Sequence, residues 1–450
     1  MKHQPISPEM SIADLMRNWP ATIAVFQRHR MACVGCAIAP FNSVAKAAEI
    51  YGLPLETFLA ELQAAIQKEQ LPTGPPSGMG YRFRAQKEGW RLPILMLALL
   101  ALLAGLWAGL LRLGWSLPAL SWRLPAQHGP LMVSGFLGTL ITLERAVALS
   151  QLQAGRRFYY LAPLLSGAGA LTLLTTLPAG IPRGLSTLGA LGLVLIFVTI
   201  CRLQPTTDHL VMGGGALLWL AGSALWLAGR PVSQSVPWWI GFLVLTIAGE
   251  RLELARILLL NRPVRLAFIT IVAALLAGIV LTLVDNDAGW RLSGLALVAL
   301  GLWLLRFDIA RRTIRRAGVT RFIAISLLTG YVWLVGGGLL WLIYGSQATA
   351  GPIYDAMLHA LFLGFVFSMI FGHAPVIVPA LLKTSLSFSA VVYLPLVWLH
   401  LSLALRLLSD LHYWAPGRRW GGLLNELALL LFLLVMVLAV RRAGAGRGAS

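Results

Sequence analysis

The stretch Tyr354–Pro379, YDAMLHALFLGFVFSMIFGHAPVIVP, decides how the rest of the chain is interpreted. It is apolar enough to span a membrane, yet it contains His359 and His373. Two other stretches share its spacing, in which a Gly-Phe pair is followed by Ile six positions after the Gly and by a polar residue nine positions after it. The three copies begin at Gly135, Gly241 and Gly364 and end at Glu144, Glu250 and His373. Three matches in register indicate an internal repeat.

The composition is typical of a membrane protein with many spans. The 450-residue chain is 58% hydrophobic and 12% charged, whereas a soluble domain has about 25% charged residues. Its net charge of +19 comes mostly from basic residues in short loops between apolar runs, which favours a role in membrane orientation over nucleic-acid binding. The three cysteines cannot form a disulfide framework. The first spanning run begins only after residue 90, so no cleavable signal peptide is expected.

The order of polar and apolar segments predicts four regions. Residues 1–70 form a soluble helical domain in which Ser11 and Ser43 open helices. Residues 71–90 form a Pro/Gly-rich linker and a basic flank, 91–443 the membrane domain and 444–450 a disordered tail. We expect about twelve spans in the membrane domain, the third at 158–178. Basic residues concentrate in alternate loops, which puts both termini in the cytoplasm. We expect the chain to lie in a bacterial inner membrane, with lipid as its surroundings.

The repeat gives the membrane domain an internal order. Its three copies fall on the second, sixth and tenth spans, so the period is four helices. The sequence therefore predicts an all-α bundle of about twelve helices in three pseudo-repeated four-helix units. A pseudo-threefold arrangement of these units brings Glu144, Glu250 and His373 to a similar depth, toward the cytoplasmic half.

Charged side chains within the spans need an explanation, because a charge deep in a bilayer costs about 3 kcal/mol or more unless it is paired or functional. Glu144–Arg145 and Glu250–Arg251 either neutralise each other locally, pair across helices or belong to a proton or ligand path. Pairing is the favoured interpretation. His373 either forms a second metal site (copper or iron) or proton site with Glu144 and Glu250, or caps a broken helix end.

Two histidines from distant repeats point to a haem. His128 opens the second span and His359 lies about two turns into the tenth, so both belong to the outer side. Imidazole is a usual axial ligand of haem iron, and two facing helices can hold one haem b between them. Gly135 and Gly364 leave space for a flat macrocycle beside these ligands. The alternative is that His128 lies in the headgroup region and His359 bonds a neighbouring helix.

Residues 10–68 resemble the small domain associated with hybrid-cluster proteins and with ScdA-type iron–sulfur-repair proteins. The matching residues are Pro20, Phe26, His29, Met31-Ala32-Cys33-Val34-Gly35-Cys36, Pro40-Phe41 and Tyr51-Gly52-Leu53. The resemblance implies a cytosolic redox or nitrosative-stress setting, with redox or iron–sulfur proteins as partners. Its candidate redox thiols, Cys33 and Cys36, can form a disulfide, bind a metal or react with nitric oxide.

The membrane domain resembles the haem–copper oxidase superfamily and, within it, the NnrS family of haem proteins of the nitric oxide response. The run His128-Gly129-Pro130-Leu131-Met132 is similar to the His-Gly-x-x-Met haem motif of helix two, and His359 matches the helix-ten ligand by place. This resemblance implies that His128, His359 and Met132 lie at a haem site. The sixth and seventh spans lack His and the tenth lacks a His-x-His pair, which argues against a copper site, a high-spin haem and oxidase activity.

Together these features predict a haem-binding membrane protein that senses, detoxifies or transfers electrons linked to nitric oxide and carries a cytosolic CxxC domain. Whether it turns over a substrate stays open. One rival is a cofactor-free transporter or channel with a regulatory CxxC domain, which suits the Gly-rich spans and paired charges. Another is a membrane scaffold that tethers the CxxC domain.

Overall fold

The computed structural model describes residues 6–29, 31, 43–70, 91–118, 121–152, 157–203, 205–255, 258, 260–347, 349–382 and 388–445. Cys33, Cys36, the predicted linker and residues 446–450 lie outside these ranges. The described residues form helices and no strand beyond one isolated bridge between Ser11 and Ser43, which confirms the predicted all-α class. Two compact units are present. The first comprises Met1–Glu88 with Leu254–Leu260, and the second comprises Gly89–Glu253 with Asn261–Ser450.

The first unit is a small helical domain with its own core. Its helices are α1 (Ile12–Asn18), α2 (Thr22–Arg28), α3 (Val44–Tyr51) and α4 (Leu55–Gln70). Ser11 and Ser43 each accept a hydrogen bond from a backbone N–H in the first turn, so both predicted N-caps are confirmed. Phe26 and Phe58 meet edge to face in the core, with ring centroids 5.6 Å apart.

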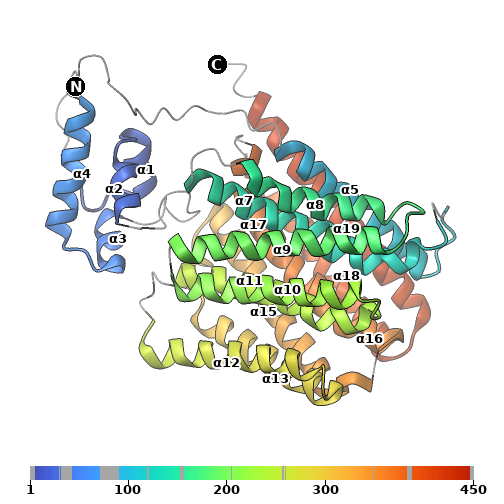
Figure 1. Ribbon diagram of the computed structural model, residues 1–450. Helices are drawn as coiled ribbons and strands as arrows, with labels where there is room; N and C mark the ends of the chain where they lie inside the picture. Colours follow the sequence, from blue (N-terminus) through green and yellow to red (C-terminus); the bar gives the residue numbers. More distant parts are fainter. Residues whose placement is uncertain are drawn as a thin grey trace. The chain divides into compact units, whose positions relative to one another are not determined.

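The second unit holds the long apolar helices, which lie roughly along one direction (Figure 1). Its first half consists of α5 (Arg91–Arg112), η2 (Leu124–Gln127), α6 (His128–Pro130), η3 (Leu131–Gly138), α7 (Thr139–Leu152), η4 (Arg157–Tyr160), α8 (Leu161–Thr172), α9 (Gly180–Leu203), α10 (Thr207–Leu227) and α11 (Val232–Ala255). Its second half consists of α12 (Arg262–Leu281), α13 (Asn286–Phe307), α14 (Ala310–Thr313), α15 (Gly318–Tyr344), η6 (Gly345–Gln347), α16 (Gly351–His359), η7 (Ala360–Phe367), α17 (Ser368–Leu382), η8 (Ala390–Val392), α18 (Tyr393–Leu411) and α19 (Ala415–Ala445).

Eleven helical segments of the described part are long and apolar enough to cross a membrane, one fewer than the twelve predicted. The predicted span that is not among the eleven is the run at 158–178, because its helix α8 has only 12 residues. The chain leaves the helix after Thr172, and the Thr175 hydroxyl donates back to the Thr172 carbonyl, a local bond that competes with helix continuation. The short α8 still packs inside the bundle, where Ser166 Oγ donates to the Ser134 carbonyl at 2.6 Å. The chain is thus a multi-pass membrane protein whose predicted segment order is kept.

The second and tenth spans, numbered with α8 counted as the third, share a feature that the sequence did not reveal. Each contains an eight-residue π-helical segment, η3 in one and η7 in the other. Gly135 and Gly364, the equivalent glycines of the repeat, are each the fifth residue of their segment. The π-helical turns therefore fall at the same repeat position. Such turns are rare, and they occur frequently at functional sites.

Candidate functional site

The two histidines predicted to share a ligand lie together at one end of the second unit, called here the imidazole end. His128 begins α6 and His359 ends α16, so each precedes a π-helical segment. Their ring centroids are 6.1 Å apart and their ring planes differ by 30°. The second and tenth spans therefore meet through these two imidazoles.

The backbone fixes which nitrogen of each ring carries the hydrogen. His128 Nδ1 lies 2.8 Å from the Gly105 carbonyl of α5, and His359 Nδ1 lies 2.9 Å from the Asp355 carbonyl. A carbonyl only accepts hydrogen bonds, so both Nδ1 atoms are donors in the neutral rings. Each Nε2 then keeps its lone pair, and a backbone-bonded Nδ1 is the usual arrangement of a metal-ligating histidine.

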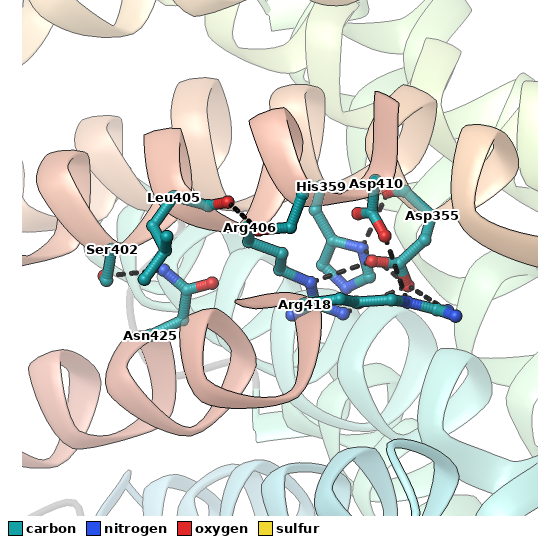
Figure 2. A network of polar contacts seen from close by, with 9 residues as sticks. Asp355, His359, Ser402, Leu405, Arg406, Asp410, Arg418 and Asn425 are labelled. Atoms are coloured by element: carbon teal, nitrogen blue, oxygen red, sulfur yellow. Dashed lines mark hydrogen bonds and ion pairs between the residues drawn. The ribbon is translucent and has the colours of Figure 1, made fainter. Parts of the chain in front are cut away.

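An ion-pair network surrounds His359 (Figure 2). Asp355 Oδ1 lies 3.4 Å from His359 Nδ1. Arg406 of α18 binds the same carboxylate with two nitrogens, Nε to Oδ2 at 2.8 Å and Nη2 to Oδ1 at 3.0 Å. Only 8% of the Arg406 side chain and 14% of the Asp355 side chain are exposed, so little water screens this two-pronged contact. The network fixes α16, and with it His359, against α18.

The network continues along the facing surfaces of α18 and α19. Arg418 Nε lies 3.0 Å from Asp410 Oδ1, and Arg418 Nη2 lies 3.6 Å from Asp355 Oδ1, so one guanidinium contacts two carboxylates. Farther along the same pair of helices the Asn425 amide lies 2.7 Å from Ser402 Oγ (Figure 2). These contacts hold the last two helices together beside His359.

The other predicted haem neighbours face helices of the bundle. Met132 packs on Gly105, the residue whose carbonyl binds His128. Gly135 lies against alanines of α5 and α8, and Gly364 lies against the Trp333 side chain. The space that these glycines leave free is thus occupied by neighbouring side chains. This differs from the prediction that they make room for a macrocycle.

The predicted intramembrane charges meet at the opposite end of the same helices, called here the carboxylate end. Arg145 of α7 hydrogen-bonds Glu250 of α11 and lies 3.7 Å from Glu144. Arg251 does not pair with its neighbour Glu250. Its Nε lies 3.4 Å from Asp308 Oδ2, and its Nη1 donates to His373 Nε2 at 3.5 Å. Pairing, the favoured interpretation, is therefore what the structure contains, and it takes the form of pairing across helices. All three repeat helices meet here.

His373 has both ring nitrogens engaged. Nδ1 donates to the Met369 carbonyl at 2.7 Å, and Nε2 faces the Arg251 guanidinium. A nitrogen that accepts from a guanidinium cannot at the same time bind a metal ion, so this arrangement does not favour the predicted second metal site at His373. His373 instead links the tenth span to the sixth.

Sequence reasoning missed the acidic and basic residues of the network beside His359. The sequence-based prediction gave Asp355, Arg406 and Arg418 no role at the site. The usable signal was the presence of Arg406 and Asp410 within an otherwise apolar span, since such residues are rare and functional by default. Their partner Asp355 lies 51 positions away along the chain and required the folded arrangement.

The fold and these polar clusters define a multi-pass α-helical membrane protein with an appended helical domain. The chain belongs to the family described as domain of unknown function DUF8744, whose pattern matches residues 91–441. Residues 6–59 match a second family, domain of unknown function DUF1858. Comparisons with curated proteins and with solved structures yield no match.

Proposed function

We propose that the second unit binds one haem b through His128 and His359 and transfers electrons in a response to nitric oxide. The observation that carries this proposal is the placement of the two imidazoles. A metal-bound imidazole nitrogen lies about 2 Å from the metal and its ring centroid about 1 Å behind it, so two imidazoles on one iron have centroids about 6 Å apart. The observed separation of 6.1 Å agrees with this value.

The chemistry of the donors also fits a haem. Both Nδ1 atoms donate to backbone carbonyls, which leaves both Nε2 lone pairs free to bind iron. A bound haem supplies one-electron chemistry, and with two histidine ligands it has no open position for a gas. The arrangement therefore favours electron transfer over nitric oxide binding or sensing at the iron.

The nitric oxide context rests on the resemblances described above, to the NnrS family and to the small domain with Cys33 and Cys36. A bacterial inner membrane with both termini in the cytoplasm is part of the same proposal, because the basic loops favour that orientation. Cytosolic redox or iron–sulfur proteins then exchange electrons with the thiol-bearing domain.

A visible spectrum of the full-length protein from haem-replete cells tests the proposal. We expect a low-spin Soret and α-band spectrum that is lost or changed to high-spin in His128→Ala and in His359→Ala. His412→Ala is the matched control, because His412 also bonds the carbonyl four residues earlier but its side chain is exposed. Reduced protein should keep its spectrum on brief exposure to nitric oxide, whereas a five-coordinate haem would shift at once.

Ordinary aromatic pairs without a metal also have ring centroids about 4.5–7 Å apart. The same distance thus fits a pair with and without iron, and the spectrum distinguishes the two. A colourless preparation would refute the haem and favour a cofactor-free transporter or channel. The observation behind that second function is the cluster of Arg145, Glu250, Arg251 and His373 within the spans. Reconstituted vesicles that show solute or proton flux, abolished in Glu250→Gln, would support it.

A further inference from the structure

A separate group of metal-type donors lies where α10 begins and α11 ends. It consists of Asp208, His209 and Glu253, whose donor atoms all lie within 4.8 Å of one another. Asp208 is buried, with 2% of its surface exposed, and the other two residues are half-buried. Asp208 Oδ2 and His209 Nε2 are 3.8 Å apart. Within the described ranges no other group of three such residues has this spacing.

Close packing of two backbones brings these side chains together. A Cβ on Gly249 of α11 would lie only 2.9 Å from the Asp208 carbonyl, and a Cβ on Gly215 of α10 would lie 2.9 Å from the Phe242 carbonyl. The two helices thus approach each other at glycines along their length. Glu253 follows Gly249 by one helical turn on the same face, which places its carboxylate beside the start of α10.

The kinds of ligand atom in this group indicate which metal ions it can bind. A tetrahedral Zn²⁺ with bonds of about 2.0–2.1 Å has ligand atoms roughly 3.4 Å apart, so the 3.8 Å pair is nearly in place and small side-chain rotations bring in the third donor. Ca²⁺ and Mg²⁺ prefer all-oxygen sites, and Cu(I) prefers thiolates. One imidazole with two carboxylates suits Zn²⁺, Fe²⁺ or Mn²⁺, with water at the remaining positions.

The donor group borders the ion pairs of the carboxylate end. Glu253 and Glu250 lie close enough to act on the guanidinium groups of both Arg145 and Arg251. Glu253 therefore belongs both to these ion pairs and to the donor group.

We propose that Asp208, His209 and Glu253 bind one divalent transition-metal ion, represented in vitro by Zn²⁺. The site is distinct from the imidazole end and does not depend on a haem. The competing explanation is a structural cluster of these three side chains that binds no metal.

Zinc analysis of the full-length chain tests the proposal. Because thiolates also bind zinc, the measurement uses the full-length Cys33→Ser/Cys36→Ser variant as its reference. The protein is stripped with a chelator, reloaded with Zn²⁺, desalted and analysed by mass spectrometry for metal per chain. We expect one zinc per chain, and a loss of affinity exceeding about 100-fold in His209→Ala and in the near-isosteric Glu253→Gln, since even outer-shell partners are worth about 10–100-fold.

Three controls separate metal binding from a structural ion triad. His412→Ala removes a histidine elsewhere and should keep its zinc. His209→Arg places a positive charge beside the carboxylates of Asp208 and Glu253 but cannot ligate, so it should fold normally and lose the metal. Size-exclusion profiles identify any variant that fails to fold. The proposal is overturned if the reference retains no zinc, or if folded His209→Arg or Glu253→Gln retains as much as the reference.

Discussion

Replacing Arg406 tests whether the contact between α16 and α18 holds the imidazole end together. The guanidinium makes two charge-assisted hydrogen bonds to Asp355 at 2.8 and 3.0 Å, in surroundings that leave 8% and 14% of the two side chains exposed. Arg406→Lys keeps the charge but not the planar fork, so it loses about one such bond, worth about 1.5–3 kcal/mol. Among the described residues, Arg406→Met leaves the buried carboxylate of Asp355 with the more distant Arg418 as its cationic partner, which costs about 3–5 kcal/mol.

The assay is the apparent melting temperature of the protein in detergent, compared within one series. We expect the order wild type, then Arg406→Lys, then Arg406→Met. The double variant Arg406→Met/Asp355→Asn should melt above Arg406→Met, because it removes the unpaired charge. Arg316→Met, which removes an exposed guanidinium, is the control and should melt as wild type does.

Two results would refute this reasoning. One is an Arg406→Met protein that melts as high as the Arg316→Met control, since the pair would then contribute nothing to stability. The other is a double variant that melts no higher than Arg406→Met, since the loss would then not come from the orphaned carboxylate of Asp355.

Three further predictions concern other parts of the molecule. Gly138→Ala should lower the melting temperature, at a cost of about 1–3 kcal/mol, because its Cβ would overlap the Trp219 ring; Gly336→Ala, which meets open space, should not. Phe58→Ala should lower the free energy of unfolding of the first unit by about 3–5 kcal/mol, because it removes a buried aromatic ring. Amide exchange should become faster in α2 and α4 and stay unchanged in the second unit. Glu250→Gln should lower the melting temperature through loss of a charge-assisted bond worth about 1.5–3 kcal/mol; an unchanged value would show that the pair with α7 is not stabilising.

Sequence reasoning was most successful where a repeat or a local rule applies. The spacing from Gly135 to Glu144 recurs twice, and that recurrence was enough to predict a four-helix period that places Glu144, Glu250 and His373 at a similar depth. The N-caps at Ser11 and Ser43 follow from rules that involve only neighbours in the chain. Both kinds of signal are contained in short windows of sequence.

Prediction from the sequence was least successful where the rotation of a helix and partners distant in the chain decide which side chains meet. Gly135 and Gly364 were predicted from their size to face a ligand, but size does not reveal which neighbouring helix a residue faces. The contacts of Asp355 with Arg406, and of Asp208 with Glu253, join residues from different helices whose pairing depends on the packing of the bundle. The end of α8 at Thr172 also depends on local hydrogen bonds that an apolar window does not contain.

The π-helical segments η3 and η7 change the angular phase between the two ends of their spans. Successive residues of an α-helix are rotated by about 100° about the helix axis, and those of a segment with i→i+5 bonds are rotated by less. Each π-helical segment therefore changes the direction in which the side chains after it point. Because of this rotational offset, His128 of the second span faces the tenth span while Arg145 of the same span faces the sixth. Deleting a single residue from η3 would restore regular winding and turn one of these two side chains toward lipid.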